Sequence, residues 1–138
     1  ELLDKSFLKN YFKLIESDSN NKKLILKLKN LLKNKKTLVI LDSNHEYEHV
    51  LKELINYGEI ITKGSFILVT DGIVDTMTYS PRRKIYNKNG GPLKALKEYL
   101  NLNRKFKKMK KPIIFNNSLV KKDIRLTHFP NGLIKKIK

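Results

Sequence analysis

The chain has 138 residues, 40% of them hydrophobic, and a formal net charge of +17. This length allows one domain with a real hydrophobic core. No apolar run approaches the roughly 20 residues that span a bilayer, and the first residues do not resemble a signal peptide. We therefore expect a soluble, cytoplasmic protein. The absence of cysteine excludes disulfides, thiolate metal sites and cysteine nucleophiles.

The positive charge suggests nucleic acid or an anionic membrane surface as a partner. Lysine far exceeds arginine, however, and asparagine and isoleucine are frequent throughout, which is typical of compositional drift in an AT-rich genome. Recognition surfaces usually favour arginine. The densest basic cluster, Arg104 to Lys111, fits either a phosphate-binding patch or a solvated helix end that runs into a strand. We expect nucleic acid not to be the main partner.

The spacing of apolar residues in the first half predicts alternating strands and helices. Gly58 is a typical helix stop. The expected elements are, in chain order, strand 11–15, helix 22–32, strand 37–41, helix 47–57 and strand 66–69.

The second half begins with an irregular stretch from Gly72 to Gly91, and a loop of that length is either functional or disordered. Pro92 is expected to open a helix that ends near Leu102. Strand pieces follow, and a hairpin turn is expected at Phe129 to Gly132. We interpret the chain as one partial domain, 1–138, with an α/β core (1–71), a loop over the site (72–91) and a helix with C-terminal strands (92–138). The expected strand pieces are 113–115, 124–127 and 133–137.

Carboxylates follow two of the predicted strands. Asp42 comes directly after the apolar run Thr37 to Leu41, and Asp71 follows Phe66 to Val69 and Thr70. Because ligands bind outside the carboxyl ends of strands in open α/β sheets, we expect Asp42 and Asp71 to lie at one cation or ligand site. The alternative is that each only caps a helix or closes a turn.

Longer motifs carry a family resemblance. Residues Val39 to Leu54 (VILDSNHEYEHVLKEL), followed by Gly64 to Asp71 (GSFILVTD), resemble the cephalosporin hydroxylase and rhamnosyl O-methyltransferase family. The resemblance continues through Leu14 to Ser19, Asn89 to Leu96 and Pro130 to Lys136, and so covers nearly the whole chain. It implies a class I S-adenosylmethionine methyltransferase with an incomplete Rossmann-like α/β sheet, containing strands three to seven, intervening helices and a C-terminal antiparallel hairpin.

The resemblance also implies a divalent metal, commonly Mg²⁺, held by Asp42 and Asp71 beside the methyl donor. Thr70 and Gly72 stand where some relatives carry a further acid or an asparagine, so this chain has fewer ligands than those relatives. His45 corresponds to the position of the general base in catechol-type methyltransferases. Its alternative is a supporting residue beside the ligands or in the first turn of a helix.

Asp18 and Ser19 follow the third strand of the resemblance, where such enzymes contact S-adenosylmethionine, although either residue could instead cap the next helix. His49, Arg82 and Arg83 are candidates to meet a saccharide or other small-molecule acceptor. Their alternatives are a helix surface for His49 and a solvated loop for the two arginines.

A glycine-rich turn that binds the donor is absent from the first 35 residues. We therefore expect a C-terminal portion of a longer protein, a split enzyme whose separate partner chain supplies the N-terminal half, or a decayed relic. Without strands one and two, the strand Thr37 to Leu41 would expose an apolar edge. Such an edge favours a partner or a homo-oligomer.

The expected function is metal-assisted, S-adenosylmethionine-dependent O-methyl transfer to a hydroxyl of a small molecule, a sugar or a glycolipid. Two alternatives stay open. One is a noncatalytic remnant that acts as an interaction module, and the other is a basic nucleic-acid-binding module.

Overall fold

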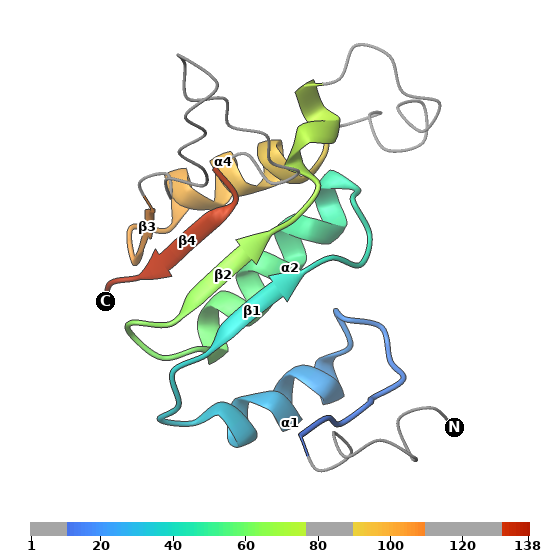
Figure 1. Cartoon of the computed structure of the whole chain (residues 1–138), viewed down its shortest axis with the longest axis vertical. Coiled ribbons are helices and arrows are strands. Elements are labelled where there is room, and N and C mark those ends of the chain that lie inside the picture. Colours follow the sequence, from blue (N-terminus) through green and yellow to red (C-terminus); the bar gives the residue numbers. More distant parts are fainter. Residues whose placement is uncertain (1–10, 77–89, 110–130) are drawn as a thin grey trace, which may run out of the picture.

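A computed structural model describes residues 11–76, 90–109 and 131–138 of the chain (Figure 1). These residues form three α-helices, one 3-10 helix, η2, and four short strands. The elements are α1 (Lys22–Leu32), β1 (Leu38–Leu41), α2 (Tyr47–Ile60), β2 (Phe66–Val69), η2 (Gly72–Thr76), α4 (Pro92–Leu102), β3 (Phe106–Lys108) and β4 (Leu133–Lys136).

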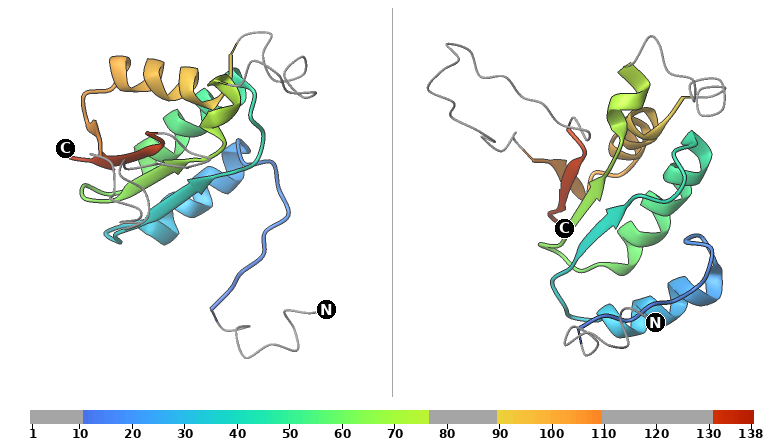
Figure 2. Two further views of the ribbon diagram at one scale, coloured as in Figure 1. Left: turned by 45° about the horizontal axis from the view of Figure 1, so that its top comes forward. Right: turned by 45° about the vertical axis from the view of Figure 1, so that its right-hand side comes forward.

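The strands form one mixed sheet of four strands in the order β1-β2-β4-β3. β1 and β2 run parallel, with Leu38 beside Phe66 and Leu41 beside Val69. β4 lies antiparallel to both β2 and β3. Helices α2 and α4 lie side by side on one face of the sheet (Figure 2). The described residues thus form a helix layer on a sheet whose two parallel strands end at the same edge.

Among the described strands, β1 lies at an edge of the sheet, as the sequence predicted. Its side chains alternate between the two faces of the sheet. Leu41 is buried, whereas Leu38 and Ile40 are 56% and 57% exposed. One apolar face of β1 therefore remains open to solvent.

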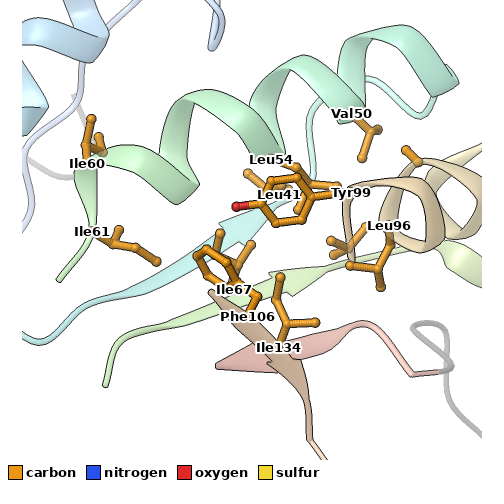
Figure 3. Close-up of a cluster of buried hydrophobic side chains, with 12 residues drawn as sticks. Leu41, Val50, Leu54, Ile60, Ile61, Ile67, Leu96, Tyr99, Phe106 and Ile134 are labelled. Atoms are coloured by element: carbon orange, nitrogen blue, oxygen red, sulfur yellow. The ribbon is translucent and has the colours of Figure 1, made fainter. Parts of the chain in front are cut away.

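The hydrophobic core fills the space between the sheet and the helices α2 and α4 (Figure 3). Leu54 of α2, Ile67 of β2 and Ile134 of β4 are completely buried there. Burying a side chain of this size contributes about 1.5–3 kcal/mol. This core fixes the ends of β1 and β2 relative to the two helices.

Helix α2 does not end at Gly58, so the predicted stop is wrong. The helix continues to Ile60, and Gly58 is buried inside it. A Cβ atom at Gly58 would lie 2.0 Å from the Tyr99 hydroxyl oxygen and 3.0 Å from the ring atom Cζ. Glycine is needed here because Tyr99 packs directly on the helix backbone.

The C-terminal end of α2 is capped by Lys136 of β4. Its Nζ donates hydrogen bonds of 2.8 Å to the carbonyl oxygens of Gly58 and Ile61. A cation at this end also complements the helix dipole. Burial lowers the pKa of the Lys136 ammonium group below its ordinary value. The contact ties β4 to the helix layer.

The basic cluster lies after the end of α4: Arg104 and Lys105 form a turn that leads into strand β3, so the predicted strand is confirmed and the predicted helical part of the cluster is wrong. Phe106 is buried, and its ring lies 5.3 Å from that of Tyr99 between centroids. Lys107 and Lys108 are exposed on the same strand, which pairs with β4. The buried Phe106 thus anchors β3 to the core, although the lysines around it are exposed to solvent.

The strand predicted at Tyr11 to Ile15 is also wrong. Residues 11 to 17 form neither helix nor strand, and Figure 2 shows them leading away from the helices and the sheet. A strand needs a neighbour for its N–H and C=O groups, and no described strand lies beside this segment. The predicted strand pieces at 113–115 and 124–127 lie outside the described residues.

Tyr99 gives the fold a pH dependence in alkaline solution. Burial raises the pKa of its hydroxyl well above the ordinary value of 10.0. The unfolded chain therefore ionises this tyrosine first, and the stability it contributes is complete below about pH 10 and is lost as the pH rises further. We expect Tyr99→Phe to reduce the fall in unfolding free energy between about pH 8 and about pH 11.

Urea unfolding of the wild-type and variant chains at both pH values measures this difference. Tyr11→Phe is the matched control, because Tyr11 is 81% exposed. Tyr99→Phe also loses the hydrogen bond from the Asn103 side chain, so it should be about 1 kcal/mol less stable at neutral pH. If the unfolding free energy of Tyr99→Phe falls as steeply between the two pH values as that of wild type, Tyr99 is not the source of the pH dependence.

Candidate metal centre at the strand ends

Asp42, His45 and Asp71 converge at the carboxyl ends of β1 and β2. One potential ligand atom from each residue lies within 4.8 Å of those of the other two. His45 Nε2 is 3.2 Å from an Asp71 carboxylate oxygen and 3.6 Å from one of Asp42. The two acids meet because β1 and β2 are parallel neighbours in register. His45 reaches them from the turn that leads into α2.

The backbone of Asp71 is strained. Its φ angle is +48°, in the left-handed region that residues with a Cβ atom seldom adopt. Strain of this kind costs about 1–3 kcal/mol and clusters at functional sites. Here it turns the chain sharply from β2 into η2 and leaves the Asp71 side chain within the cluster.

Thr70 lies within this cluster. Its hydroxyl is within hydrogen-bond distance of an Asp42 carboxylate oxygen and lies 2.9 Å from the Leu41 carbonyl oxygen. One hydroxyl proton serves one of these acceptors at a time. Thr70 thus supplies a neutral oxygen and a donor that orients Asp42, where an acid would supply negative charge.

Gly72 explains why the chain has no side-chain ligand after Asp71. It is buried beneath Leu93 of α4, and a Cβ atom at Gly72 would lie 2.8 Å from the Leu93 side chain. A larger residue would require the Leu93 side chain to shift. Among the described residues, the donor atoms of the centre are therefore two carboxylates, one imidazole and the Thr70 hydroxyl.

This donor set fits a divalent cation. Mg²⁺ and Mn²⁺ bind carboxylate and hydroxyl oxygens and keep several waters. The side chains of Asp42 and Asp71 are 63% and 41% exposed. Water or a substrate oxygen can therefore reach the same position.

A second polar cluster surrounds His49, one helical turn after His45. His49 Nε2 lies 3.0 Å from Ser19 Oγ and 3.3 Å from Ser43 Oγ. Ser43 donates a 2.7 Å hydrogen bond to Glu53, whose carboxylate also lies 3.6 Å from His49 Nε2. Glu53 is 1% exposed, and a buried carboxylate is costly unless it has such partners.

Glu53 was not among the residues predicted for the site. The signal was its position four residues after His49, which places both side chains on one face of α2. Ser43 links the two clusters, because it follows Asp42 directly and contacts Glu53 and His49.

The loop before α1 brings Ser19 to this second cluster. The Tyr57 hydroxyl donates to the Ser19 carbonyl oxygen at 2.9 Å. Asn21 caps α1, because its side chain accepts from two backbone N–H groups of the first turn. The capping alternative for Asp18 and Ser19 is therefore wrong. Asp18 instead accepts a hydrogen bond from the backbone of Asn20 within the loop.

Asp75 in η2 is a further carboxylate at this edge. One of its oxygens accepts a 3.0 Å hydrogen bond from the backbone N–H of Lys94, in the first turn of α4. A Cβ atom at Gly91 would lie 2.1 Å from the other oxygen. Asp75 thus holds the start of α4 against η2. Arg82 and Arg83 lie outside the described residues.

The family model for Rhamnosyl O-methyltransferase/CmcI matches residues 3–137 of the chain. The chain belongs to this family. Comparison with curated proteins and with solved structures gives no match. The resemblance predicted from the sequence is thus confirmed, and the mixed sheet with its helices is consistent with a partial methyltransferase-like fold.

Within the Rhamnosyl O-methyltransferase/CmcI family, an O-methyltransferase activity is the general expectation for this chain. The described residues of this family member contain no helix with the length and apolarity to cross a membrane.

Proposed function

We propose that the chain carries the metal and acceptor side of an S-adenosylmethionine-dependent O-methyltransferase. The observation that carries this proposal is the convergence of Asp42, His45 and Asp71 at the ends of two parallel strands, in a member of an O-methyltransferase family. The acceptor would be a hydroxyl of a small molecule, a saccharide or a glycolipid.

Asp42 and Asp71 would hold the divalent cation, most naturally Mg²⁺. Both carboxylates offer hard oxygen ligands, and Thr70 keeps one Asp42 oxygen in place. A bound cation would lower the pKa of an acceptor hydroxyl and fix its orientation.

His45 would remove the proton from the acceptor hydroxyl. Its Nε2 faces both carboxylates, and Mg²⁺ prefers oxygen to imidazole nitrogen. The imidazole is therefore left for proton transfer, for which histidine is suited near neutral pH. The acceptor oxygen would then attack the methyl carbon of the donor in line, while the bond from that carbon to the sulfonium sulfur breaks and S-adenosylhomocysteine leaves, without a covalent enzyme intermediate.

The donor would lie beside the loop that contains Asp18 and Ser19. Ser19 is held by His49 and Tyr57 close to Ser43, the residue after Asp42. This places the loop next to the proposed metal ligands. His49, Arg82 and Arg83 remain candidates for contact with the acceptor.

The glycine-rich donor turn would come from a partner segment. β1 is the edge strand of the described sheet, which supports this part of the proposal, because an unpaired strand edge is suited to strand pairing. Leu38 and Ile40 are exposed on the adjoining face of the sheet. A separate chain is one source of this segment. A noncatalytic interaction module is the alternative that Thr70 and Gly72 favour, since neither adds a charged ligand.

Titration calorimetry of S-adenosylmethionine in the presence of Mg²⁺ tests this function. We expect no donor binding by the present chain alone and saturable binding once the chain is extended by the coding sequence that precedes it. Binding that also requires intact Ser19 would support the donor position. If neither protein binds the donor, the methyltransferase proposal fails and the noncatalytic module takes its place.

A further inference from the structure

Helix α1 has an apolar side that only partly packs in the core. Ile25, Leu28 and Leu32 contact the core and are partly buried, and no residue of the helix is fully buried. Leu26 and Leu31 are 62% and 52% exposed on the rest of its surface. The helix packs against α2 and lies at the margin of the described residues (Figure 1).

The exposed side of α1 is also strongly cationic. At about 100° per residue, Lys23 and Lys27 lie between Leu26 and Leu31 on the side that faces away from the core. The sequence from Asn21 to Leu41 contains no aspartate or glutamate. Its lysines are Lys22, Lys23, Lys27, Lys29, Lys33, Lys35 and Lys36.

The segment that leads into α1 adds exposed apolar groups. Tyr11, Phe12 and Leu14 are all more than half exposed. Exposed aromatic and leucine side chains next to lysines form a mixed basic and apolar surface, which suits contact with the headgroups and outer acyl region of an anionic membrane. We call α1 together with residues 11–15 the α1 surface.

We propose that the α1 surface docks on an anionic lipid bilayer, with α1 lying along the membrane plane. Lysines would meet the lipid phosphates, and Leu26, Leu31 and the apolar groups of residues 11–15 would enter the interface. A nucleic-acid backbone would attract the lysines but would offer no apolar region for the leucines. A second copy is disfavoured by repulsion between chains of net charge +17. This inference does not depend on the proposed methyltransferase function.

Co-sedimentation of the full chain with vesicles tests the proposal. One set of vesicles contains phosphatidylcholine alone, and the other contains equal parts of phosphatidylcholine and phosphatidylglycerol. We expect binding to the second set only, and weaker binding at high salt. Lys23→Gln with Lys27→Gln should lower the apparent affinity by about fivefold for each lysine, or roughly 25-fold together. Leu26→Ser with Leu31→Ser should cause a loss of roughly tenfold or more.

Lys97→Gln with Lys107→Gln is the matched control, because both lysines are exposed and belong to α4 and β3. It removes the same charge and should leave binding nearly unchanged. An equal loss in this control would show that only bulk charge acts and would overturn the proposal. Absence of binding would do so as well. Equal binding to duplex DNA, insensitive to the leucine changes, would instead assign the surface to nucleic acid. Circular dichroism and thermal melting verify that each variant is folded.

Discussion

Replacing Asp42 with alanine should abolish the binding of Mg²⁺ or Mn²⁺ by the chain. Asp42 supplies one of the two carboxylates of the centre, and its loss leaves a single anionic ligand in Asp71. Removing a residue that only hydrogen-bonds to a metal ligand lowers metal affinity by up to roughly 100-fold. Removing the ligand Asp42 itself should lower it by more than that. Stability should change by no more than about 0.5 kcal/mol, because the Asp42 side chain is mostly exposed. Calorimetry with Mn²⁺ measures the affinity directly.

Glu48→Ala is the matched control for this experiment. Glu48 is an exposed acid near the start of α2 and is not part of the cluster. It removes the same charge and should leave the metal affinity within a few-fold of wild type. An equal loss of metal affinity in Asp42→Ala and Glu48→Ala would mean that the affinity depends only on the net charge of the chain.

His45→Ala separates the role of His45 as a base from a role as a ligand. If His45 is the base, the metal affinity changes little in His45→Ala. Methyl transfer, measured in the extended chain that binds S-adenosylmethionine, falls by about 10²–10⁴-fold. A loss of metal affinity as large as that in Asp42→Ala would make His45 a ligand and contradict its assignment as the base.

Replacing Gly58 with alanine should destabilise the fold by about 2 kcal/mol. The new Cβ atom would overlap the Tyr99 hydroxyl, which is buried and cannot move without disturbing its contact with Phe106. Overpacking of this kind usually costs about 1–3 kcal/mol. The higher helix propensity of alanine relative to glycine contributes at most about 1 kcal/mol in the opposite direction. Urea unfolding gives the difference in free energy.

The double variant Gly58→Ala, Tyr99→Phe tests this cause. Removing the hydroxyl relieves the closest overlap, so the two changes should cost less together than the sum of the single variants. Lys52→Ala, at an exposed position of the same helix, should change stability by less than about 0.5 kcal/mol. Strict additivity in the double variant would mean that Tyr99 is not the obstacle.

Segments with strong local patterns were predicted well from the sequence. The apolar spacing of 22–32, the apolar run 66–69 and the proline at the start of 92–102 indicate elements that the structure confirms. The two helices have an apolar periodicity or a local start signal, and the strand is a continuous apolar run. These properties do not depend on distant residues, so a sequence pattern can report them.

The wrong predictions share a tertiary cause. Gly58 has the composition of a helix stop, but the ring of Tyr99 from another helix determines its role. Phe106 forms a strand because β4 arrives beside it from a distant part of the chain. Tyr11 to Ile15 has the composition of a strand and lacks a described neighbour to pair with.

The candidate site divides in the same way. The meeting of Asp42 and Asp71 follows from a rule on parallel strands, which the sequence alone could apply. The contributions of Thr70 and Gly72 depend on where Asp42 and Leu93 lie in space. No spacing in the sequence encodes those contacts.

The place of β4 in the sheet has a consequence for synthesis of the protein. β4 is the latest of the four described strands in the sequence, yet it lies between β2 and β3 and holds the end of α2 through Lys136. A nascent chain on the ribosome can form the parallel pair of β1 and β2, but β4, with which β3 pairs among the described strands, forms only when Leu133–Lys136 have emerged. The sheet can therefore close only after translation of this last segment, and a chain stalled before it would expose both the flank of β2 and the buried face of α4 to chaperones and proteases.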